Sequence, residues 1–384
     1  MSLVSVHHCS DYLQDTIDRA LSACLEDVKA QELFKPGDKV LLKANLLGPR
    51  RPEEGVTTHP EIVAGLARWF SARGAEVWVG DSSGGVGRSG ARGNTARALK
   101  ATGVAEAAEQ AGARIVNFDA GTSSFVSGGL EWEKVLVAQP VLDADLVVSV
   151  PKLKTHGLTL MTAGIKNMFG IVPGAVKAQY HRIAPGIDQF CQGIVDVFAA
   201  SHTRLTVMDA VEAMDGDGPS AGRVVHRGLV LASRDTVALD AAACYLVDCE
   251  PRRVRTTVFA ARQGLGSMDF QLTGEPVEVM PFKLPLTGMT GPLSARLSGP
   301  FFALLRHLPR IDPEVCVNCN LCVNSCPVEA LTAGEKNPVL SPAKCIHCYC
   351  CHELCPHRAI DLVAVNPRLV RVMDWLSKRR RSRR

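Results

Sequence analysis

The sequence predicts an α/β protein with a mainly parallel sheet and flanking helices, followed by a small α+β domain at the C-terminus. Strand-like and helix-like segments alternate through residues 1–275, which is typical of a parallel sheet with helices on both faces. Residues 276–310 are rich in Pro and Gly and predict a connector. Eight of the fourteen cysteines then form two similar runs within residues 311–365, and a basic tail follows at 366–384.

Local signals place the elements of the large domain. Residues 40–45 form a short apolar run after the turn residues Pro36 and Gly37, and predict a buried strand. A helix is expected to begin near Pro60, which suits a first turn, and to end near Gly74. Further strands are predicted at 76–81, 114–118, 146–150, 204–209 and 228–232, a further helix at 235–248, and a short apolar helix in the connector near 300–308.

The two cysteine runs share the form Cys-x2-Cys-x2-Cys-x3-Cys-Pro and repeat each other at an offset of 29 residues. This spacing is typical of two [4Fe–4S] clusters, because three close thiolates bind one cluster and the fourth binds the other. The predicted ligands are Cys316, Cys319, Cys322 and Cys355 for one cluster, and Cys345, Cys348, Cys351 and Cys326 for the other.

Structural zinc is the alternative, since Cys-x2-Cys pairs also bind zinc. Two interlocked runs of four cysteines, each followed by a proline, favour iron–sulfur clusters. Cys350 would break the repeat if it replaced Cys351 as a ligand, so we expect it to be a small apolar filler. The other five cysteines lack ligand spacing.

Composition and charge limit the class of protein. No apolar run approaches the roughly 18 residues of a membrane span, and no secretory signal is visible at the N-terminus. Thiols kept reduced as ligands then predict a cytoplasmic protein.

The net charge of +4 is produced by the tail. Residues 366–384 contain eight Lys or Arg and one Asp, a net of +7, so the rest of the chain sums to about −3. We expect the tail to be solvated, with contact to an anionic surface or an acidic redox partner as the functional alternative. Nucleic-acid binding is not expected, because no aromatic platform or recognition helix accompanies the tail.

The predicted substrate site follows the apolar strand at 146–150, because ligands of open α/β sheets bind beyond the carboxyl ends of strands. Almost no acid occurs between residues 146 and 187, and the density of donors favours an anionic ligand over ordinary surface lysines. The predicted catalytic residues are His156, His181 and Lys154, and the predicted substrate-binding residues are Lys152, Lys166, Asn167 and Lys177.

Two further segments carry weaker predictions. The loop at 81–90 follows a strand and fits either a phosphate cradle or a plain flexible loop. Asp209, Asp215 and Asp217 fit either a divalent-cation site or a simple turn, since glycines and a proline lie among them.

Several of these segments together resemble a known family. They are Lys43-Ala-Asn45, Thr57-Thr-His-Pro60, the PKLKTH run at 151–156, Lys166-Asn167 with Gly170, and Lys177 with His181. The combination resembles the domain of unknown function numbered three-six-two, which is often joined to a bacterial-type two-cluster ferredoxin module. The resemblance covers about residues 1–275, with Ala210 as a departure where the family typically has Gly. It adds Lys43 and Asn45 to the predicted substrate-binding residues and implies no reaction.

Together these features predict an iron–sulfur oxidoreductase that passes low-potential electrons to a small anionic substrate in the large domain. His156 or His181 would donate the proton, because a group that titrates near neutral pH is needed. A two-electron step needs both clusters or a flavin, for which the sequence shows no motif. An electron-donor protein is the expected partner, and the sequence does not predict the oligomeric state. The alternatives are an electron carrier whose large domain docks to a partner enzyme, and a redox-sensing binding protein.

Overall fold

The computed structural model describes residues 1–384 apart from 85–93, 286, 288–305, 367 and 369–384. Most of the helix predicted near 300–308, nearly all of the basic tail and most of the loop at 81–90 lie outside the described residues. The last two residues of that predicted helix belong instead to strand β13 (His307–Ile311). Among the helices that are described, none is long and apolar enough to cross a membrane.

The large domain is built on a ten-stranded sheet. Its strands are β1 (Ser2–His8), β2 (Lys39–Lys43), β3 (Glu76–Asp81), β4 (Arg114–Asn117), β7 (Leu146–Ser149), β8 (Lys152–His156), β9 (Leu160–Thr162), β10 (Thr203–Asp215), β11 (Arg223–Ser233) and β12 (Phe270–Gly274). Eight of them follow the order β12-β1-β11-β10-β7-β2-β3-β4, while β8 pairs with β10 and β9 pairs with β8. The run from β10 through β7, β2 and β3 to β4 is parallel at every step, which confirms the predicted mainly parallel sheet.

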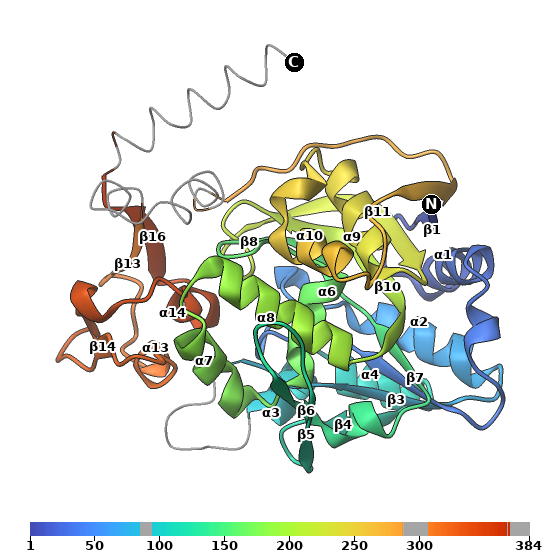
Figure 1. The fold of residues 1–384 in the computed structure, drawn as a ribbon, viewed down its shortest axis with the longest axis horizontal. Helices are drawn as coiled ribbons and strands as arrows, with labels where there is room; N and C mark the ends of the chain where they lie inside the picture. Colours follow the sequence, from blue (N-terminus) through green and yellow to red (C-terminus); the bar gives the residue numbers. More distant parts are fainter. Residues whose placement is uncertain (85–93, 286, 288–305, 367, 369–384) are drawn as a thin grey trace.

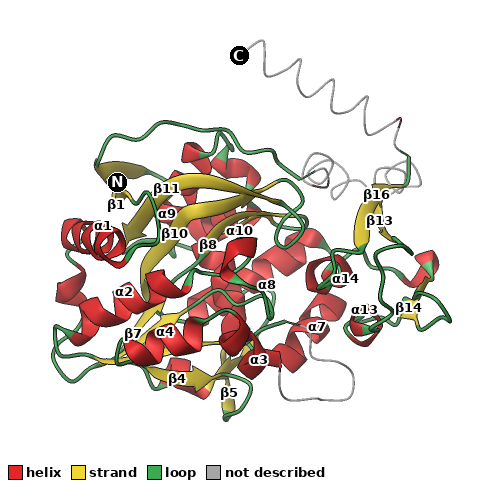
Figure 2. Ribbon diagram, turned by 180° about the vertical axis from the view of Figure 1, so that it is seen from behind, coloured by secondary structure: helices red, strands yellow, loops and turns green. Residues whose placement is uncertain are grey.

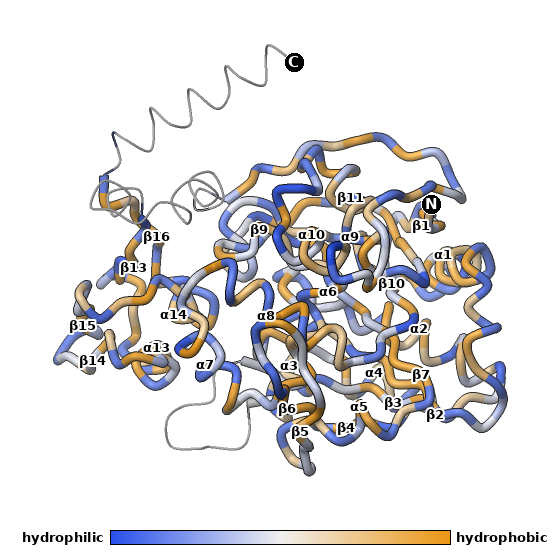
Figure 3. Tube along the Cα trace, viewed as in Figure 1, coloured by the Kyte–Doolittle hydropathy of each residue, from blue (hydrophilic) through white to orange (hydrophobic). Residues whose placement is uncertain are grey.

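Helices cover both faces of this sheet (Figure 2). One layer holds α1 (Gln14–Asp27), α2 (Pro60–Ser71) and α4 (Val104–Gln110), and the other holds α6 (Gly164–Asn167), α8 (Ile187–Ala200), α9 (Thr236–Leu246) and α10 (Arg255–Arg262). Adjacent side chains of β2 point to opposite faces of the sheet, so that Leu42 packs with α1 and α2 whereas Leu41 packs with α8. In Figure 3 the tube through α2 and β7 is mainly apolar, as expected for elements buried on the sheet.

The predicted strands of the large domain are present as β2, β3, β4, β7, β10 and β11, and the predicted helices as α2 and α9. Sequence analysis missed β1, which joins the sheet antiparallel to β11 with Val6 opposite Leu231. It also missed that the residues after β7 form a second strand, β8, in which Lys152 lies opposite Asp209 of β10. The cationic run at 152–156 is therefore part of the sheet and is buried.

The small domain is a duplicated unit. Strand β13 pairs antiparallel with β16 (Ile360–Ala364), and β14 (Leu331–Thr332) pairs with β15 (Val339–Leu340). Helices α13 (Leu321–Asn324) and α14 (Cys350–Leu354) begin 29 residues apart. The residues before them, Asn320 and Tyr349, both have a left-handed backbone, with φ of 57° and 62°. The backbone thus repeats at the same offset as the cysteines.

The small domain packs on the large one beside α7 (Gly174–Ile183), as Figure 1 shows. The Arg50 guanidinium donates hydrogen bonds to the backbone carbonyls of Cys355 and Pro356, at 2.6 and 2.9 Å. The Ser220 hydroxyl donates to the carbonyl of Glu353 at 2.8 Å. These contacts hold α14 against the loops that follow the strands of the large domain.

Candidate functional site

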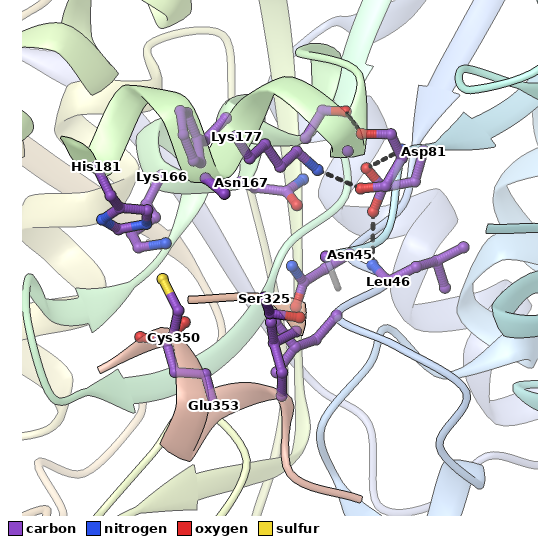
Figure 4. A pocket seen from close by; sticks show the side chains of 18 of the residues that line it. Asn45, Leu46, Asp81, Lys166, Asn167, Lys177, His181, Ser325, Cys350 and Glu353 are labelled. Atoms are coloured by element: carbon purple, nitrogen blue, oxygen red, sulfur yellow. Dashed lines mark hydrogen bonds between the residues drawn. The ribbon is translucent and has the colours of Figure 1, made fainter. Parts of the chain in front are cut away.

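A cavity of about 110 Å³ lies between the two domains (Figure 4). Its walls come from the segments that follow β2 and β3, from α6 and α7, and from the helices of the small domain. Because β2 and β3 are parallel neighbours, their last residues bring Lys43 and Asp81 side by side. The cavity therefore lies beyond the carboxyl ends of the strands, where ligands of open α/β sheets bind.

Sequence prediction named nine catalytic or substrate-binding residues in the large domain, and the structure divides them into two groups. Six line the cavity, namely Lys43, Asn45, Lys166, Asn167, Lys177 and His181. The other three, Lys152, Lys154 and His156, lie on β8 and do not line it.

Lys43 is matched by an acid within the wall of the cavity. Its ammonium lies 2.7 Å from a carboxylate oxygen of Asp81 and donates to Asn167 Oδ1 at 3.1 Å. Burial lowers the pKa of Lys43 and raises the pKa of Asp81, and the attraction between the two charges opposes both shifts. We conclude that Lys43 mainly holds Asp81 and Asn167 in place.

The ammonium groups of Lys166 and Lys177 have fewer charged partners than that of Lys43. Among the described residues the Lys166 ammonium has no hydrogen bond or ion pair, and it lies 5.9 Å from the centre of the Phe169 ring. Desolvation lowers its pKa. Lys177 donates to the backbone carbonyl of Ser82, and burial lowers the pKa of Lys177 to about 8 although Asp81 is near. Glu353 near Lys166 and Asp81 near Lys177 offset only part of the desolvation cost, and an anion in the cavity would offset more of it.

His181 lies over the aromatic wall of the cavity. Its ring stacks on Phe190 with centroids 4.0 Å apart, and it meets Phe169 edge-on at 6.3 Å. Burial, together with the nearby Lys166 charge, lowers the pKa of His181 to about 3. The imidazole is therefore neutral at pH 7 while the cavity holds no anion.

The small domain supplies the wall that sequence analysis did not foresee. This wall consists of Ser325, Cys350, Glu353 and Leu354. Ser325 is 4% exposed, and its hydroxyl has no hydrogen-bond partner among the described residues. The side-chain oxygen of Asn45 is also without a partner there. Both atoms are available to a ligand with polar groups.

The three residues of β8 have partners of their own. Lys152 forms an ion pair with Asp209 at 2.9 Å and donates to the Tyr12 hydroxyl at 2.7 Å. Lys154 donates to the backbone carbonyl of Val56, and burial lowers the pKa of Lys154 to about 7. These contacts correct the expectation that Lys152 and Lys154 present donors to a ligand.

His156 points toward the small domain from behind the cavity wall. Its Nδ1 accepts a hydrogen bond from the backbone N–H of Leu158 at 3.0 Å, so the proton of the neutral ring is on Nε2. That Nε2 lies 3.3 Å from a carboxylate oxygen of Glu353, which does line the cavity. Desolvation holds the pKa of His156 well below its usual value.

Of the three acids predicted as a cation site or a turn, Asp209 and Asp215 lie on β10 and Asp217 lies just after it. Asp209 is paired with Lys152, and Asp215 forms an ion pair with Arg223 at 3.0 Å. Within the described part of the chain, no three or more His, Cys, Asp or Glu side chains are grouped to hold a single metal ion. Ion pairs within the sheet account for Asp209 and Asp215, and the turn interpretation applies only from residue 216 onward.

Two smaller cavities, of about 20 Å³ each, lie inside the small domain. The cysteines of the first are Cys316, Cys319, Cys322 and Cys355, and those of the second are Cys326, Cys345, Cys348, Cys351 and Cys350. Apart from Cys350, this is the division that the spacing predicts for two ligand sets.

The donor chemistry of these cavities fits iron–sulfur clusters. The backbone N–H of Ala330 donates to Cys326 Sγ at 3.2 Å, and that of Ala359 donates to Cys355 Sγ at 3.3 Å. These are the fourth cysteines of the two runs, and such bonds stabilise thiolate ligands.

Two family models match the chain. The model described as a domain of unknown function, DUF362, matches residues 40–245, and the model described as a 4Fe-4S dicluster domain matches residues 308–356. A thylakoid-associated protein of Synechocystis sp. is 32% identical over 272 residues, which are 70% of this chain and 82% of that protein.

Two solved structures align with part of the chain. The lactate racemase apoprotein from Thermoanaerobacterium thermosaccharolyticum aligns with a TM-score of 0.43 and 13% identity over 65% of this chain and 57% of its own. A protein from Thermotoga maritima aligns with a TM-score of 0.38 and 14% identity over 67% of this chain and 60% of its own. The chain thus spans less than two thirds of either protein, and these distant likenesses do not bear on function.

Proposed function

The chain belongs to the DUF362 family and carries a 4Fe-4S dicluster domain, and from this premise we propose that it is an iron–sulfur oxidoreductase. It passes low-potential electrons from the small domain to a small anionic substrate held in the cavity between the domains. An electron-donor protein reloads the small domain. The eight cysteines of the two runs hold two [4Fe–4S] clusters, in the two sets that line the two small cavities.

The observation that carries this proposal is that one cavity has cationic walls from the large domain and a wall from the cluster-binding domain. A protein that only carried electrons to a partner would have no use for an enclosed group of lysines. The lysines of the cavity line a hollow instead of a convex docking surface, which supports the oxidoreductase over the carrier.

Each group in the cavity has a role in this proposal. Lys166 and Lys177 bind the anion, and Asn45 and Ser325 bind its polar groups. His181 holds the proton, because an anion beside the ring stabilises the imidazolium and raises the pKa of His181 above its value in the empty cavity. Proton and substrate would therefore arrive together.

The clusters, when bound, supply one electron each, so a two-electron reduction draws on both. His156 is a positioning residue here, because it faces Glu353 and not the cavity itself. Of the two histidines predicted to donate the proton, only His181 lines the cavity, and it is the proton donor in this proposal.

The test uses the full chain, reconstituted with iron and sulfide without oxygen and reduced with a low-potential dye. A panel of small carboxylates and oxoanions is added, and reoxidation is followed by visible absorbance. At least one anion should reoxidise the wild type and fail with Lys166→Gln and His181→Gln, whereas Lys134→Gln, at an exposed site on another part of the domain, should behave as wild type.

Two results would overturn the proposal. One is reoxidation at the wild-type rate in both cavity variants. The other is that no anion reoxidises the protein while an added electron-acceptor protein does, which would favour the carrier.

A further inference from the structure

Cys350 borders two cavities at once. It lines the cavity of about 110 Å³ between the domains, which we call the anion cavity, and its sulfur is there directed toward Lys166 and His181 (Figure 4). It also lines the small cavity of Cys326, Cys345, Cys348 and Cys351. Among the described residues, none lines both the anion cavity and the cavity of the first cysteine set.

The duplicated fold shows which side chain stands at the position of this thiol in the other half of the small domain. At the offset of 29 residues, the position equivalent to Cys350 is Leu321, the first residue of α13. Leu321 lines the cavity of the first cysteine set. The same position thus carries an apolar filler where it does not line the anion cavity and a thiol where it does.

Ser325 gives a second link to the same cysteine set. It precedes Cys326 in the chain, it is almost fully buried, and its hydroxyl faces the anion cavity without a partner among the described residues. Leu354 also lines the cavity and precedes Cys355 of the first set, but it offers only an apolar side chain. Of the two cavity-lining residues that directly precede a predicted ligand cysteine, the polar one therefore adjoins the set of Cys326, Cys345, Cys348 and Cys351.

We propose that Cys350 couples a ligand in the anion cavity to the group bound by Cys326, Cys345, Cys348 and Cys351, and not to the group bound by the first set. This rests on the proposed function and gives it a direction. Electrons leave the small domain on the side of Cys350, and they enter on the side of Cys319, which is exposed.

Electrostatics gives this coupling a measurable sign. An anion placed beside a redox group disfavours the addition of an electron, and the effect falls with distance and with the dielectric between the charges. An anion in the cavity should therefore lower the reduction potential of the nearer group and leave the more distant one unchanged.

The experiment is a redox titration of the reconstituted full chain, followed by electron paramagnetic resonance, with and without acetate as the probe anion. Cys319→Ser and Cys348→Ser identify which signal belongs to which cysteine set. Acetate should lower the potential of the signal altered by Cys348→Ser and leave the other where it is.

Variants at Cys350 test the residue itself. Cys350→Leu, which copies the other half of the domain, should retain the iron and change the size of the acetate-induced shift, because the shift depends on the medium between the two charges. Cys350→Ser keeps the size of the side chain and should keep the shift. If Cys350→Leu does not retain its iron, Cys350→Val makes the same test with a smaller side chain.

The possible failures are distinguishable by calorimetric titration of acetate. If acetate binds and Lys166→Gln weakens it, but both signals shift equally or Cys350→Leu keeps the full shift, the coupling through Cys350 is wrong and the anion site survives. If acetate does not bind to the wild type, or binds equally to Lys166→Gln, both the anion site and the coupling are wrong.

Discussion

Replacing Lys166 by glutamine should weaken anion binding in the cavity without destabilising the protein. Lys43, in the same cavity, already has the carboxylate of Asp81 at 2.7 Å. The Lys166 ammonium has no hydrogen bond or ion pair in the described part of the chain. A bound anion would therefore be the hydrogen-bond partner of Lys166. Removal of this charge should lower the affinity for the anion more than it changes the stability of the protein.

The size of the effect follows from the charge of the half-buried lysine. A hydrogen bond to a charged group contributes about 1.5–3 kcal/mol, which corresponds to roughly a 10- to 150-fold change in dissociation constant. Two opposite charges about 4 Å apart at an effective dielectric of about 20 attract by about 4 kcal/mol, which sets an upper limit. Desolvation already disfavours the charged form of Lys166, so the free energy of unfolding should stay level or rise in Lys166→Gln.

The assay is calorimetric titration of the iron-loaded full chain with acetate at pH 7, beside a thermal unfolding measurement. Lys134→Gln, at an exposed position on β6 (Lys134–Ala138), is the matched control and should bind acetate as the wild type does. Equal acetate affinity in Lys166→Gln and wild type would refute the reasoning. A loss of affinity that appears only with a marked fall in Tm would refute it as well, because the effect would then be structural.

Three further outcomes are expected. Lys43→Met should lower the free energy of unfolding, measured in urea, by about 3–5 kcal/mol, because it leaves the buried carboxylate of Asp81 without its partner. Adding Asp81→Asn should restore part of this loss, and an equal loss in the double variant would contradict the pairing. Acetate affinity should fall as the pH rises through about 8, where Lys177 loses its proton. Binding near and above that pH should be accompanied by proton uptake, because the bound anion raises the pKa of Lys177; calorimetry in buffers of different ionisation enthalpy measures this uptake, and Lys177→Gln should flatten the pH dependence. Removal of iron with a chelator should expose residues 307–365 to protease while the large domain stays resistant, because ligand binding and folding are linked in small metal domains; protection that is the same with and without iron would contradict this.

The sequence was most informative where the determinants are local. Cysteine spacing predicted two sets of thiols, because convergence of three thiolates on one loop depends on a few residues of backbone. The strands of the parallel sheet were likewise predicted from short apolar runs bounded by turn residues. Asp81 was within reach of the same reasoning, since it ends the strand predicted at 76–81, which in the structure is β3 and pairs with β2.

The parts that escaped prediction depend on contacts between distant residues. The run at 151–156 looked like a group of free donors because no acid lies near it in the sequence. Its Lys152 is in fact paired with Asp209, 57 residues away, inside the sheet. No pattern in the sequence indicated that α14, from a different domain, would form one wall of the cavity.

Arg50 has a consequence for whether the small domain can be exchanged for another. Its guanidinium donates hydrogen bonds to the backbone carbonyl oxygens of Cys355 and Pro356. Backbone carbonyls are present whatever the side chains of the small domain are. A foreign two-cluster module with the same Cys-Pro step would offer the same pair of acceptors. Grafting such modules onto this large domain is thus limited less by the docking contact than by the few side chains that face the cavity, with Ser325 and Cys350 foremost.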